Sequence, residues 1–462
     1  MPLRPTSKAF VSKPQLLKAK ITGACGILLL SSGLVMAADD GMFAREVAPV
    51  LIRKCLICHN EEKSKGGYRL DDTKVLLKAG DSDKPPVVAG KPEASPLFSL
   101  LIHPDADERM PQKDEPLPKT DVEAFRRWIA AGAVLPAQTI RLTTLVPRIH
   151  SAPPAVYRRA TPANAMAVAS DGKQLAVGGI NEAILWDSSG TQMISRLTNL
   201  PPQIQTLDFS PDGSWLAVAG GLSGQFGEAV VQKPADPGSR KMLVGLKDLV
   251  LDVRFSPDGR LLAVAGADNA VRLFSTSDWK ETRVLQQHAD WVVSVAFSVD
   301  GKRLVTASRD KTVRVSNLED GQLEATYMNH GAPVLAAAFS QDGKLVLSGG
   351  RDRAVHGWRV SDGKEQFRLK EPEGDIQRLL VRSNDLFVAS ADKLVRQYRI
   401  DTKTLVRTFQ GHRDWVQSLV VPKEGGVIYS GGFDGEVRVW KLANGELDRR
   451  FVPTPGFEQV QR

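Results

Sequence analysis

Ser298-Val299-Asp300-Gly301 is one copy of a turn signal that recurs along most of the chain, and this recurrence determines the predicted fold. The related turns are Ser170-Asp171-Gly172, Ser210-Pro211-Asp212-Gly213, Ser256-Pro257-Asp258-Gly259 and Ser340-Gln341-Asp342-Gly343, with degenerate copies at Ser383-Asn384-Asp385 and Lys423-Glu424-Gly425. The steps between the last residues of successive turns are 41, 46, 42, 42, 42 and 40. A period of about 40 to 45 residues is typical of four-stranded propeller blades. Seven turns therefore predict an all-β propeller with seven blades.

Two further signals recur in phase with these turns. The expected third strand of most units carries an aromatic residue or a substitute near its end: Trp186, Phe274, Ser316, Trp358, Tyr398 and Trp440, with the second unit blurred around Val230-Val231. In three units a histidine precedes an aspartate by 22 residues, as in His288 and Asp310, His330 and Asp352, and His412 and Asp434. The fixed spacing favours structural histidines within each blade over metal ligands. The second unit also contains a glycine-rich stretch, residues 220–227, which we expect to form an irregular loop.

These residues resemble the WD-repeat family over about 300 residues of the chain. In that family the histidine, a serine or threonine, the aspartate and the tryptophan form a hydrogen-bonded set within a blade. The resemblance implies that Ser348 and Ser430 complete the sets of the fifth and seventh units, and that the fourth unit has Thr306 with Ser316 in place of tryptophan. We expect the propeller to be a docking platform for other proteins, although a fold alone does not define a function.

The first 38 residues have the layout of a secretory signal peptide. Five basic residues and no acidic residue precede an apolar run over 21–35, which ends in Val35-Met36-Ala37-Ala38. The run is shorter than the roughly 20 apolar residues of a membrane span, so we expect cleavage near Ala37 or Ala38 and a periplasmic or otherwise exported protein. Contact with a membrane is expected only if the signal is not cleaved. Cleavage also removes Cys25 and leaves Cys55 and Cys58 as the remaining cysteines.

The net charge gives little support for a nucleic-acid partner. The leader's five basic residues account for most of the formal charge of +8 and leave +3 for the mature chain. The remaining sequence has no dense stripe of basic and aromatic residues of the kind that binds nucleic acid.

Residues 39–137 have the composition of a small, helical, loop-rich domain, and residues 138–462 form the propeller region. Apolar residues spaced by three and four from Phe43 to Cys58 predict a first helix. The same spacing from Val122 to Ala133 predicts a last helix, with Thr120-Asp121 as its N-cap and an end near Gly132. A short helix around 97–102 is expected in the proline-rich middle.

Cys55-Leu56-Ile57-Cys58-His59 carries the chemistry of this domain. On a helix, positions i, i+3 and i+4 project from one side, so both sulfurs and the imidazole can reach one flat cofactor. The pattern predicts one covalently bound haem c, with thioethers from Cys55 and Cys58 and His59 as the proximal iron ligand. A zinc site, a redox-active dithiol and a simple disulfide are the alternatives. Zinc commonly requires a second ligand pair, and a redox dithiol commonly lies in a βαβ unit.

Met110 is the predicted distal iron ligand. It lies in a polar, proline-flanked loop, Asp107-Glu108-Arg109-Met110-Pro111, where methionine has little reason to serve as a core residue. A thioether ligand raises the reduction potential of a haem. His103 and an open distal site are the alternatives. Near the motif, Arg53, Lys54, Lys63 and Lys65 form either a steering surface for an acidic redox partner or an ordinary solvated face.

From Phe43 to about Leu135 the domain resembles the planctomycete-type cytochrome c family. The shared segments are Pro49-Val50-Leu51, Cys55 to His59, Lys65 to Asp71, Gly90 to Ser95, Met110-Pro111 and Trp128 to Ala133. The resemblance implies a small all-α, class I-like cytochrome c domain that binds haem and transfers electrons, fused to the WD-repeat propeller.

Three functions are therefore compatible with the sequence. The first is an exported mono-haem electron carrier that exchanges electrons with redox partner proteins and docks them through the propeller. The second is a haem enzyme with an open distal site, and whether the chain is an enzyme stays open on sequence alone. The third is an interaction scaffold in which haem is structural or sensory.

Overall fold

The computed structural model describes residues 42–61, 63–112, 114–135, 142, 150–422 and 426–457. The predicted leader with Cys25, the boundary between residues 137 and 138, and the turn at residues 423–425 lie outside the described residues. No helix in the described part of the chain is long and apolar enough to cross a membrane.

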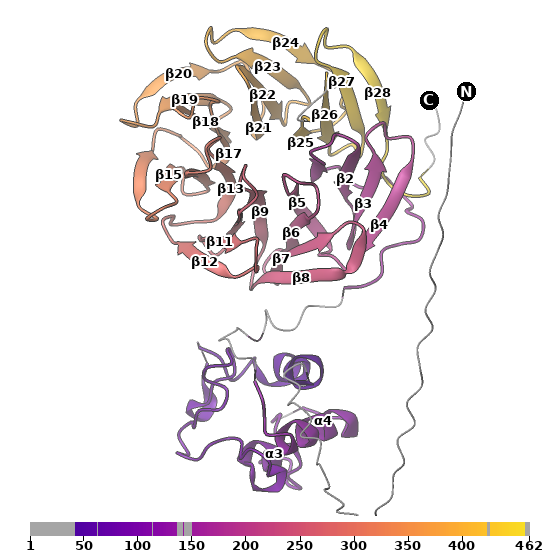
Figure 1. The fold of residues 1–462 in the computed structure, drawn as a ribbon, viewed down its shortest axis with the longest axis vertical. Coiled ribbons are helices and arrows are strands. Elements are labelled where there is room, and N and C mark those ends of the chain that lie inside the picture. The colour runs from indigo at the N-terminus through magenta and orange to yellow at the C-terminus, as the bar shows by residue number, and fades with distance from the viewer. Residues whose placement is uncertain are drawn as a thin grey trace, which may run out of the picture. The chain divides into compact units, whose positions relative to one another are not determined.

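Residues 42–135 are helical and loop-rich (Figure 1). They have a hydrophobic core of their own. The helical elements are η1 (Phe43–Val47), α2 (Ala48–Val50), η2 (Leu51–Cys55), η3 (Lys65–Gly67), η4 (Pro92–Ala94), α3 (Pro96–Leu101) and α4 (Lys119–Ala130). The three elements from η1 to η2 follow one another directly. The expected helix ending at the cysteine motif and the expected short middle helix are therefore present.

The first helical stretch has wide turns rather than regular α-helical turns. Both η1 and η2 are π-helical, and the N–H of Leu56 donates to the carbonyl of Leu51 five residues earlier, at 2.8 Å. Pro49 lies in the middle of this stretch, where it lacks an N–H and would collide with the carbonyl four residues earlier in a regular α-helix. Phe43, Val47 and Leu51 are nevertheless fully buried on one face, as their spacing predicts.

Helix α4 closes this core but begins two to three residues earlier than expected. Its N-cap is Pro118, and no side chain caps it, so the predicted N-cap at Thr120-Asp121 is wrong. Proline readily takes the extended conformation needed just before a helix, with φ −54° and ψ 146° here. Phe125 and Ile129 are fully buried, and the Trp128 indole N–H donates to the carbonyl of Val134 at 3.0 Å.

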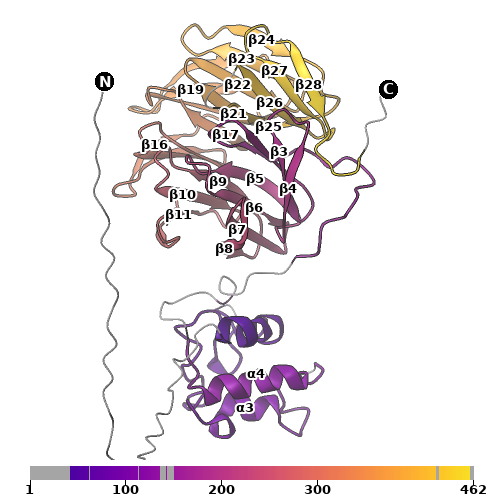
Figure 2. The same ribbon diagram turned by 45° about the vertical axis from the view of Figure 1, so that its right-hand side comes forward.

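The described residues from 166 to 451 form seven antiparallel four-stranded sheets, which are the blades of a closed propeller (Figures 1 and 2). Blade 1 contains β1 (Met166–Val168), β2 (Gln174–Gly178), β3 (Glu182–Asp187) and β4 (Met193–Thr198). Blade 2 contains β5 (Gln203–Phe209), β6 (Leu216–Leu222), β7 (Phe226–Lys233) and β8 (Asp236–Leu246). Blade 3 contains β9 (Val250–Phe255), β10 (Leu261–Gly266), β11 (Val271–Ser275) and β12 (Glu281–Leu285).

The other four blades have the same strand order. Blade 4 contains β13 (Val292–Phe297), β14 (Arg303–Ser308), β15 (Val313–Asn317) and β16 (Leu323–Tyr327). Blade 5 contains β17 (Val334–Phe339), β18 (Leu345–Gly350), β19 (Val355–Arg359) and β20 (Glu365–Leu369). Blade 6 contains β21 (Ile376–Arg382), β22 (Asp385–Ser390), β23 (Val395–Arg399) and β24 (Leu405–Phe409), and blade 7 contains β25 (Val416–Val420), β26 (Val427–Gly432), β27 (Val437–Lys441) and β28 (Leu447–Phe451). The predicted number of blades is confirmed.

In blades 1 to 6 the recurring turn connects the first and second strands. In blade 3, the Ser256 hydroxyl donates to Asp258 Oδ1 at 2.6 Å and accepts the N–H of Leu261 at 2.9 Å. Gly259 has a φ of +72°, which a residue with a Cβ adopts only with strain. The serine, the aspartate and the glycine thus each have a separate task in one tight turn.

The glycine-rich stretch in blade 2 is a hairpin and not the irregular loop expected. Leu222 pairs with Phe226 across a tight turn, and the N–H of Gln225 donates to the carbonyl of Leu222 at 3.0 Å. A Cβ on Gly221 would collide with the Phe226 carbonyl oxygen. Glycine therefore allows two strands to approach closely here, and does not mark disorder.

Blades 7 and 1 meet at a seam where the two ends of the propeller come together. The first strands of the blades contact one another around the ring, including β1 against β25. At the seam the N–H of Ala163 donates to the carbonyl of Gly432 at 3.0 Å, and the Ser418 hydroxyl donates to the carbonyl of Ala163 at 2.7 Å. Leu175 and Val177 of blade 1 share a core cluster with Tyr429 of blade 7. Each blade is complete within its own segment, so the seam closes by packing and hydrogen bonds without an exchanged strand.

Candidate haem site and the buried histidines of the propeller

The backbone of the Cys55–His59 motif is fixed by hydrogen bonds on both sides. Helix η2 ends at Cys55, and the N–H groups of Cys58 and His59 both donate back to the Cys55 carbonyl, at 3.1 and 3.2 Å. The N–H of Lys65 donates to the Cys58 carbonyl at 3.2 Å, and the N–H of Leu70 donates to the His59 carbonyl at 2.9 Å. The residues after the motif therefore fold back over it and hold its geometry.

The His59 imidazole has one nitrogen committed to the protein. Nδ1 lies 3.1 Å from the carbonyl oxygen of Tyr68. A carbonyl oxygen accepts and never donates, so Nδ1 carries the proton and Nε2 is the basic nitrogen. A metal-binding histidine characteristically has this arrangement, in which a backbone carbonyl or a carboxylate fixes the ring and its tautomer.

Tyr68 is the positioning residue that the sequence alone did not single out. Its hydroxyl donates to the Leu76 carbonyl at 2.7 Å, its carbonyl holds His59, and its ring stands edge-on to the imidazole with the centroids 5.6 Å apart. Burial raises the pKa of the Tyr68 phenol well above its usual range, so the group stays protonated. In the sequence, only the preceding Gly66-Gly67 pair points to this role of Tyr68. Both glycines have positive φ and turn the chain back toward the motif.

A cavity of about 200 Å³ joins the predicted residues. Cys55, His59 and Met110 all line it. The rest of its lining is Lys65, Gly66, Tyr68, Leu70, Gly80, Ser82, Lys84, Pro86, Pro96, Leu97, Leu100 and Leu101. Most of these side chains are apolar, which suits the flat hydrophobic body of a porphyrin. Cys58 belongs to the motif but is not part of this lining.

Met110 reaches the cavity because its loop is attached to the end of α3. The N–H of Met110 donates to the Leu100 carbonyl at 2.9 Å, and the Met110 side chain packs against the core cluster of this region. A thioether and an imidazole thus line the same cavity, as the predicted pair of axial ligands requires.

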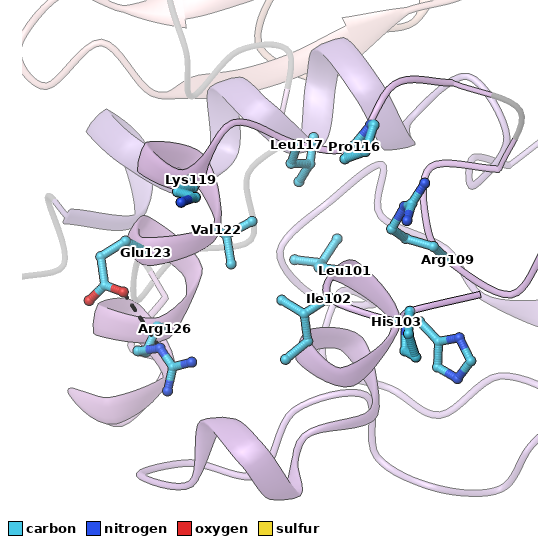
Figure 3. A pocket seen from close by; sticks show the side chains of 11 residues that line it. Leu101, Ile102, His103, Arg109, Pro116, Leu117, Lys119, Val122, Glu123 and Arg126 are labelled. Carbon is cyan, nitrogen blue, oxygen red and sulfur yellow. Dashed lines mark ion pairs between the residues drawn. The ribbon is translucent and has the colours of Figure 1, made fainter. Parts of the chain in front are cut away.

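His103, the alternative distal residue, lies at a different cavity. It lines a second cavity between the end of α3 and α4, together with Leu101, Arg109 and Val122 (Figure 3). Its Nδ1 accepts the N–H of Asp105 at 3.2 Å, and its Nε2 lies 3.3 Å from Glu108. The geometry therefore favours Met110.

Cys55 and Cys58 are not joined by a disulfide in the structure. Burial, with a smaller contribution from Cys58, raises the pKa of the Cys55 thiol to about 12. A redox-active dithiol needs a lowered pKa, so this environment is opposite to that of such a site. The described residues also place no cluster of three metal-binding side chains around the thiols, which disfavours structural zinc.

The basic residues near the motif are only partly available to a partner. Lys54 is paired with Asp114 at 2.7 Å, whereas Lys63 is exposed and Lys65 lies at the rim of the cavity. The side chain of Arg53 lies outside the described part of the chain.

In the propeller, the three phased histidines have both ring nitrogens occupied. His412 lies 3.1 Å from Asp434 through Nδ1 and 2.8 Å from the Ser430 hydroxyl through Nε2, and the Trp440 indole N–H donates to the same hydroxyl at 2.8 Å. His330 contacts Asp352 at 2.7 Å and Ser348 at 2.8 Å, and His288 contacts Asp310 at 2.9 Å and Thr306 at 2.7 Å. In blade 4 the Ser316 hydroxyl, which replaces tryptophan, donates to Gln287 at 2.7 Å. The predicted hydrogen-bonded sets are confirmed.

Comparison with known proteins identifies both parts. Residues 55–114 match the model of the family described as "Planctomycete cytochrome C". Residues 241–275, 279–316, 321–359 and 403–441 match the "WD domain, G-beta repeat" model. Each of these matches begins at the outer strand of one blade and ends at the third strand of the next.

Curated relatives match short stretches of the chain. The chain is 32% identical over 74 residues to "THO complex subunit 6" of Homo sapiens, which is 16% of this chain and 22% of that protein. It is 36% identical over 77 residues to "Nuclear distribution protein PAC1" of Coccidioides posadasii (17% and 16%), and 34% identical over 68 residues to "Protein transport protein SEC13" of Chaetomium thermophilum (14% and 22%). The chain thus spans about a fifth of the length of these relatives, and it combines a segment similar to planctomycete cytochromes c with a seven-bladed WD-repeat propeller.

Proposed function

We propose that the protein is an exported mono-haem c-type cytochrome that transfers electrons between protein partners. The observation that carries the proposal is the cavity shared by Cys55, His59 and Met110, with His59 oriented through its Nδ1 by the Tyr68 carbonyl. The proposal extends to the class I-like cytochrome fold of residues 39–137 and to a signal peptide over residues 1–38.

The residues present fit a covalently bound haem. Cys55 and Cys58 would hold it through thioether bonds, and His59 Nε2 and Met110 Sδ would be its axial ligands. When bound, the haem supplies one-electron redox chemistry at its iron. The chain itself contributes a fixed imidazole tautomer, a thioether that favours the reduced state, and apolar walls that limit access of water.

The propeller supports a docking role in this function. WD-repeat relatives include a protein named as a subunit of a complex, and the propeller of this chain offers exposed aromatic residues. Trp415 and Phe433 are 49% and 47% exposed, with their ring centroids 6.3 Å apart. We propose that redox partners are held through such propeller surfaces while the haem domain exchanges electrons.

Spectroscopy of the exported full-length protein tests this proposal. We expect the protein to retain one haem per chain under denaturing conditions, with the haem lost from Cys55→Ser/Cys58→Ser. In Met110→Ala we expect covalent haem to remain, the reduction potential to fall, and carbon monoxide to bind the reduced protein rapidly. His103→Gln serves as the matched control and should leave the spectrum unchanged.

Two results contradict parts of this proposal in different ways. Absence of covalent haem in the exported protein would refute the cytochrome. Rapid carbon monoxide binding in the wild type, unchanged by Met110→Ala, would instead indicate an open distal site and an enzyme.

A further inference from the structure

Blade 5 carries a second buried histidine, at a position where sister blades carry arginine. The position lies two residues before the third-strand aromatic residue or its substitute. It is occupied by Arg272, Arg314, Arg396 and Arg438 in blades 3, 4, 6 and 7, and by His356 in blade 5. His356 is fully buried. Blade 5 has therefore lost a permanent positive charge and gained a side chain that can bind a metal ion.

The arginines show what this position contacts. Arg272 and Arg396 pair with the aspartate four residues earlier, Asp268 at 2.5 Å and Asp392 at 2.7 Å. In blade 7, where a phased histidine already holds the equivalent Asp434, Arg438 turns to Glu436 instead. The aspartate of each of these blades thus has either an arginine or a histidine as its partner.

In blade 5 two imidazoles converge on one carboxylate oxygen. His330 Nδ1 lies 2.7 Å and His356 Nε2 lies 3.1 Å from Asp352 Oδ2. The two rings stack with their centroids 3.9 Å apart and their planes at 29°. Among the described residues, this is the one group of three such side chains whose ligand atoms all lie within 4.8 Å of one another.

The hydrogen bonds around His356 leave its Nε2 without a proton when the ring is neutral. The Tyr327 hydroxyl donates its single proton to Glu365 and lies 2.8 Å from His356 Nδ1. The phenol oxygen must then accept a hydrogen bond from Nδ1, so Nδ1 carries the ring proton. Glu365 thus holds His356 Nδ1 through the Tyr327 hydroxyl. In metal-binding histidines the nitrogen that does not bind the metal is typically held by a carboxylate or another acceptor.

Two atoms at the centre of this group have no hydrogen-bond partner. They are His356 Nε2 and Asp352 Oδ1, and both are buried. A bare imidazole nitrogen beside a carboxylate is unfavourable unless a cation lies between them, because both present lone pairs. In blades 3 and 6 a guanidinium supplies the positive charge beside the aspartate.

An opening to solvent leads to the group. A cavity of about 380 Å³ is lined by Asp352 and His356, together with Asn329, Gly331, Arg353, Ala354, Arg368, Lys370 and Pro372. The charge of Arg368 is balanced by Glu365 at 2.7 Å, while Arg353 and Lys370 are exposed and screened by solvent. The cavity gives a metal ion a route in and room for a water ligand.

We propose that blade 5 binds one divalent transition-metal ion, such as Zn²⁺, through His356 Nε2, the Asp352 carboxylate and His330 Nδ1. Two imidazoles and one carboxylate with an open fourth position suit zinc. On binding, the ring proton of His330 moves from Nδ1 to Nε2, where it is donated to the Ser348 hydroxyl oxygen 2.8 Å away, so that the Nδ1 lone pair faces the ion while the ring stays neutral. The stacked rings tilt apart to face the ion. The ion then replaces the cation that arginine supplies in the sister blades.

Zinc titration of the exported full-length protein tests this site. After chelator treatment and dialysis against Zn²⁺, we expect elemental analysis to find one zinc per chain, with iron counted separately as a measure of haem. His356→Arg restores the residue of the sister blades and should bind no zinc while keeping the fold. His356→Gln is a second variant that removes the metal-binding nitrogen if arginine does not fit beside His330. Zinc should raise the melting temperature of the wild type and of neither variant.

His103→Gln is the matched control, because His103 is a partly exposed histidine close to a carboxylate outside the propeller. It should bind zinc as the wild type does. Equal zinc in the wild type and both His356 variants, or loss of zinc in His103→Gln, would overturn the proposal. Absence of zinc from the wild type would also overturn it. The result does not depend on whether haem is attached.

Discussion

The histidines of the helical region and of the propeller differ in how many of their ring nitrogens the protein occupies. His288, His330 and His412 each use both nitrogens in hydrogen bonds to an aspartate and to a hydroxyl group. His59 uses only Nδ1, toward the Tyr68 carbonyl, and lines a cavity. With both nitrogens occupied, His288 and His412 serve the fold alone, whereas His59, with one nitrogen occupied, is positioned for a ligand. His330 does both in the proposed zinc site, because His356 joins it on Asp352. His356 is of the same kind as His59, although it lies in the propeller.

Removing His59 should give the largest effect. His59→Ala removes the proposed proximal iron ligand, so we expect either no attached haem or haem without the low-spin spectrum that the proposal predicts for the wild type. Optical spectroscopy of the exported protein measures this. His412→Ala is the matched control from the other class, and it should keep the haem spectrum while lowering the melting temperature. An unchanged spectrum in His59→Ala would end the distinction between the two classes.

Breaking the carboxylate of a complete set should give an intermediate effect on stability. Asp434→Asn weakens the bonds to His412 and to the Arg413 N–H, and we expect a loss of about 1–3 kcal/mol in the free energy of unfolding. Asp401→Asn, at an exposed turn, should change the free energy by less than about 0.5 kcal/mol. Denaturant titration compares the two, and equal losses would show that the set does not stabilise the blade.

The same aspartate should give the protein a characteristic sensitivity to acid. Burial acts to raise the pKa of Asp434, but hydrogen bonds from His412 and from the Arg413 N–H outweigh it and lower the pKa to about 2. A carboxylate with a lowered folded pKa stabilises the protein above its unfolded pKa of about 3.9, and that contribution is lost as the pH falls toward 2. Asp434→Asn should therefore lose less stability than the wild type over this pH range.

The smallest effect should come from one indole hydrogen bond. Trp440→Phe removes the indole N–H that donates to Ser430. It should lower the free energy of unfolding by about 1 kcal/mol more than Trp186→Phe does. The Trp186 indole nitrogen is buried without a hydrogen-bond partner in the described part of the chain, so phenylalanine removes an unsatisfied group there. Melting curves of the two variants provide the comparison, which would fail if Trp186→Phe were the more destabilising.

The repeating parts of the molecule could be predicted from the sequence because each blade repeats the same physical constraints. The Ser-x-Asp-Gly turn, the histidine–aspartate spacing and the third-strand aromatic are all local, so the period reveals seven blades and the partners of His412. The blade 2 hairpin was not predictable, because glycine favours both an irregular loop and a close approach of two strands. The wide turns on either side of Pro49 were likewise not predicted, because the spacing of apolar residues indicates a helix but not the width of its turns.

The candidate haem site was predicted less completely, because some of its residues act through the backbone. Cys55, Cys58, His59 and Met110 follow from residue type and spacing, but the Tyr68 carbonyl that orients His59 has no side-chain signature. His356 was missed for a different reason. It lies outside the phased histidine–aspartate pattern, and only the folding of β19 against the loop before β17 brings it onto His330.

The seam between blades 7 and 1 constrains the order in which the propeller can be assembled. The bond from Ser418 to Ala163 joins residues 255 positions apart, and the bond from Tyr429 to Ser188 joins residues 241 apart. Each blade pairs strands that follow one another directly, so blades can form as the chain emerges, whereas the ring cannot close until residues 416–439 exist. Until then Leu175 and Val177 lack the surface that finally buries them. A growing chain therefore carries an exposed apolar edge at its first blade through nearly all of propeller synthesis.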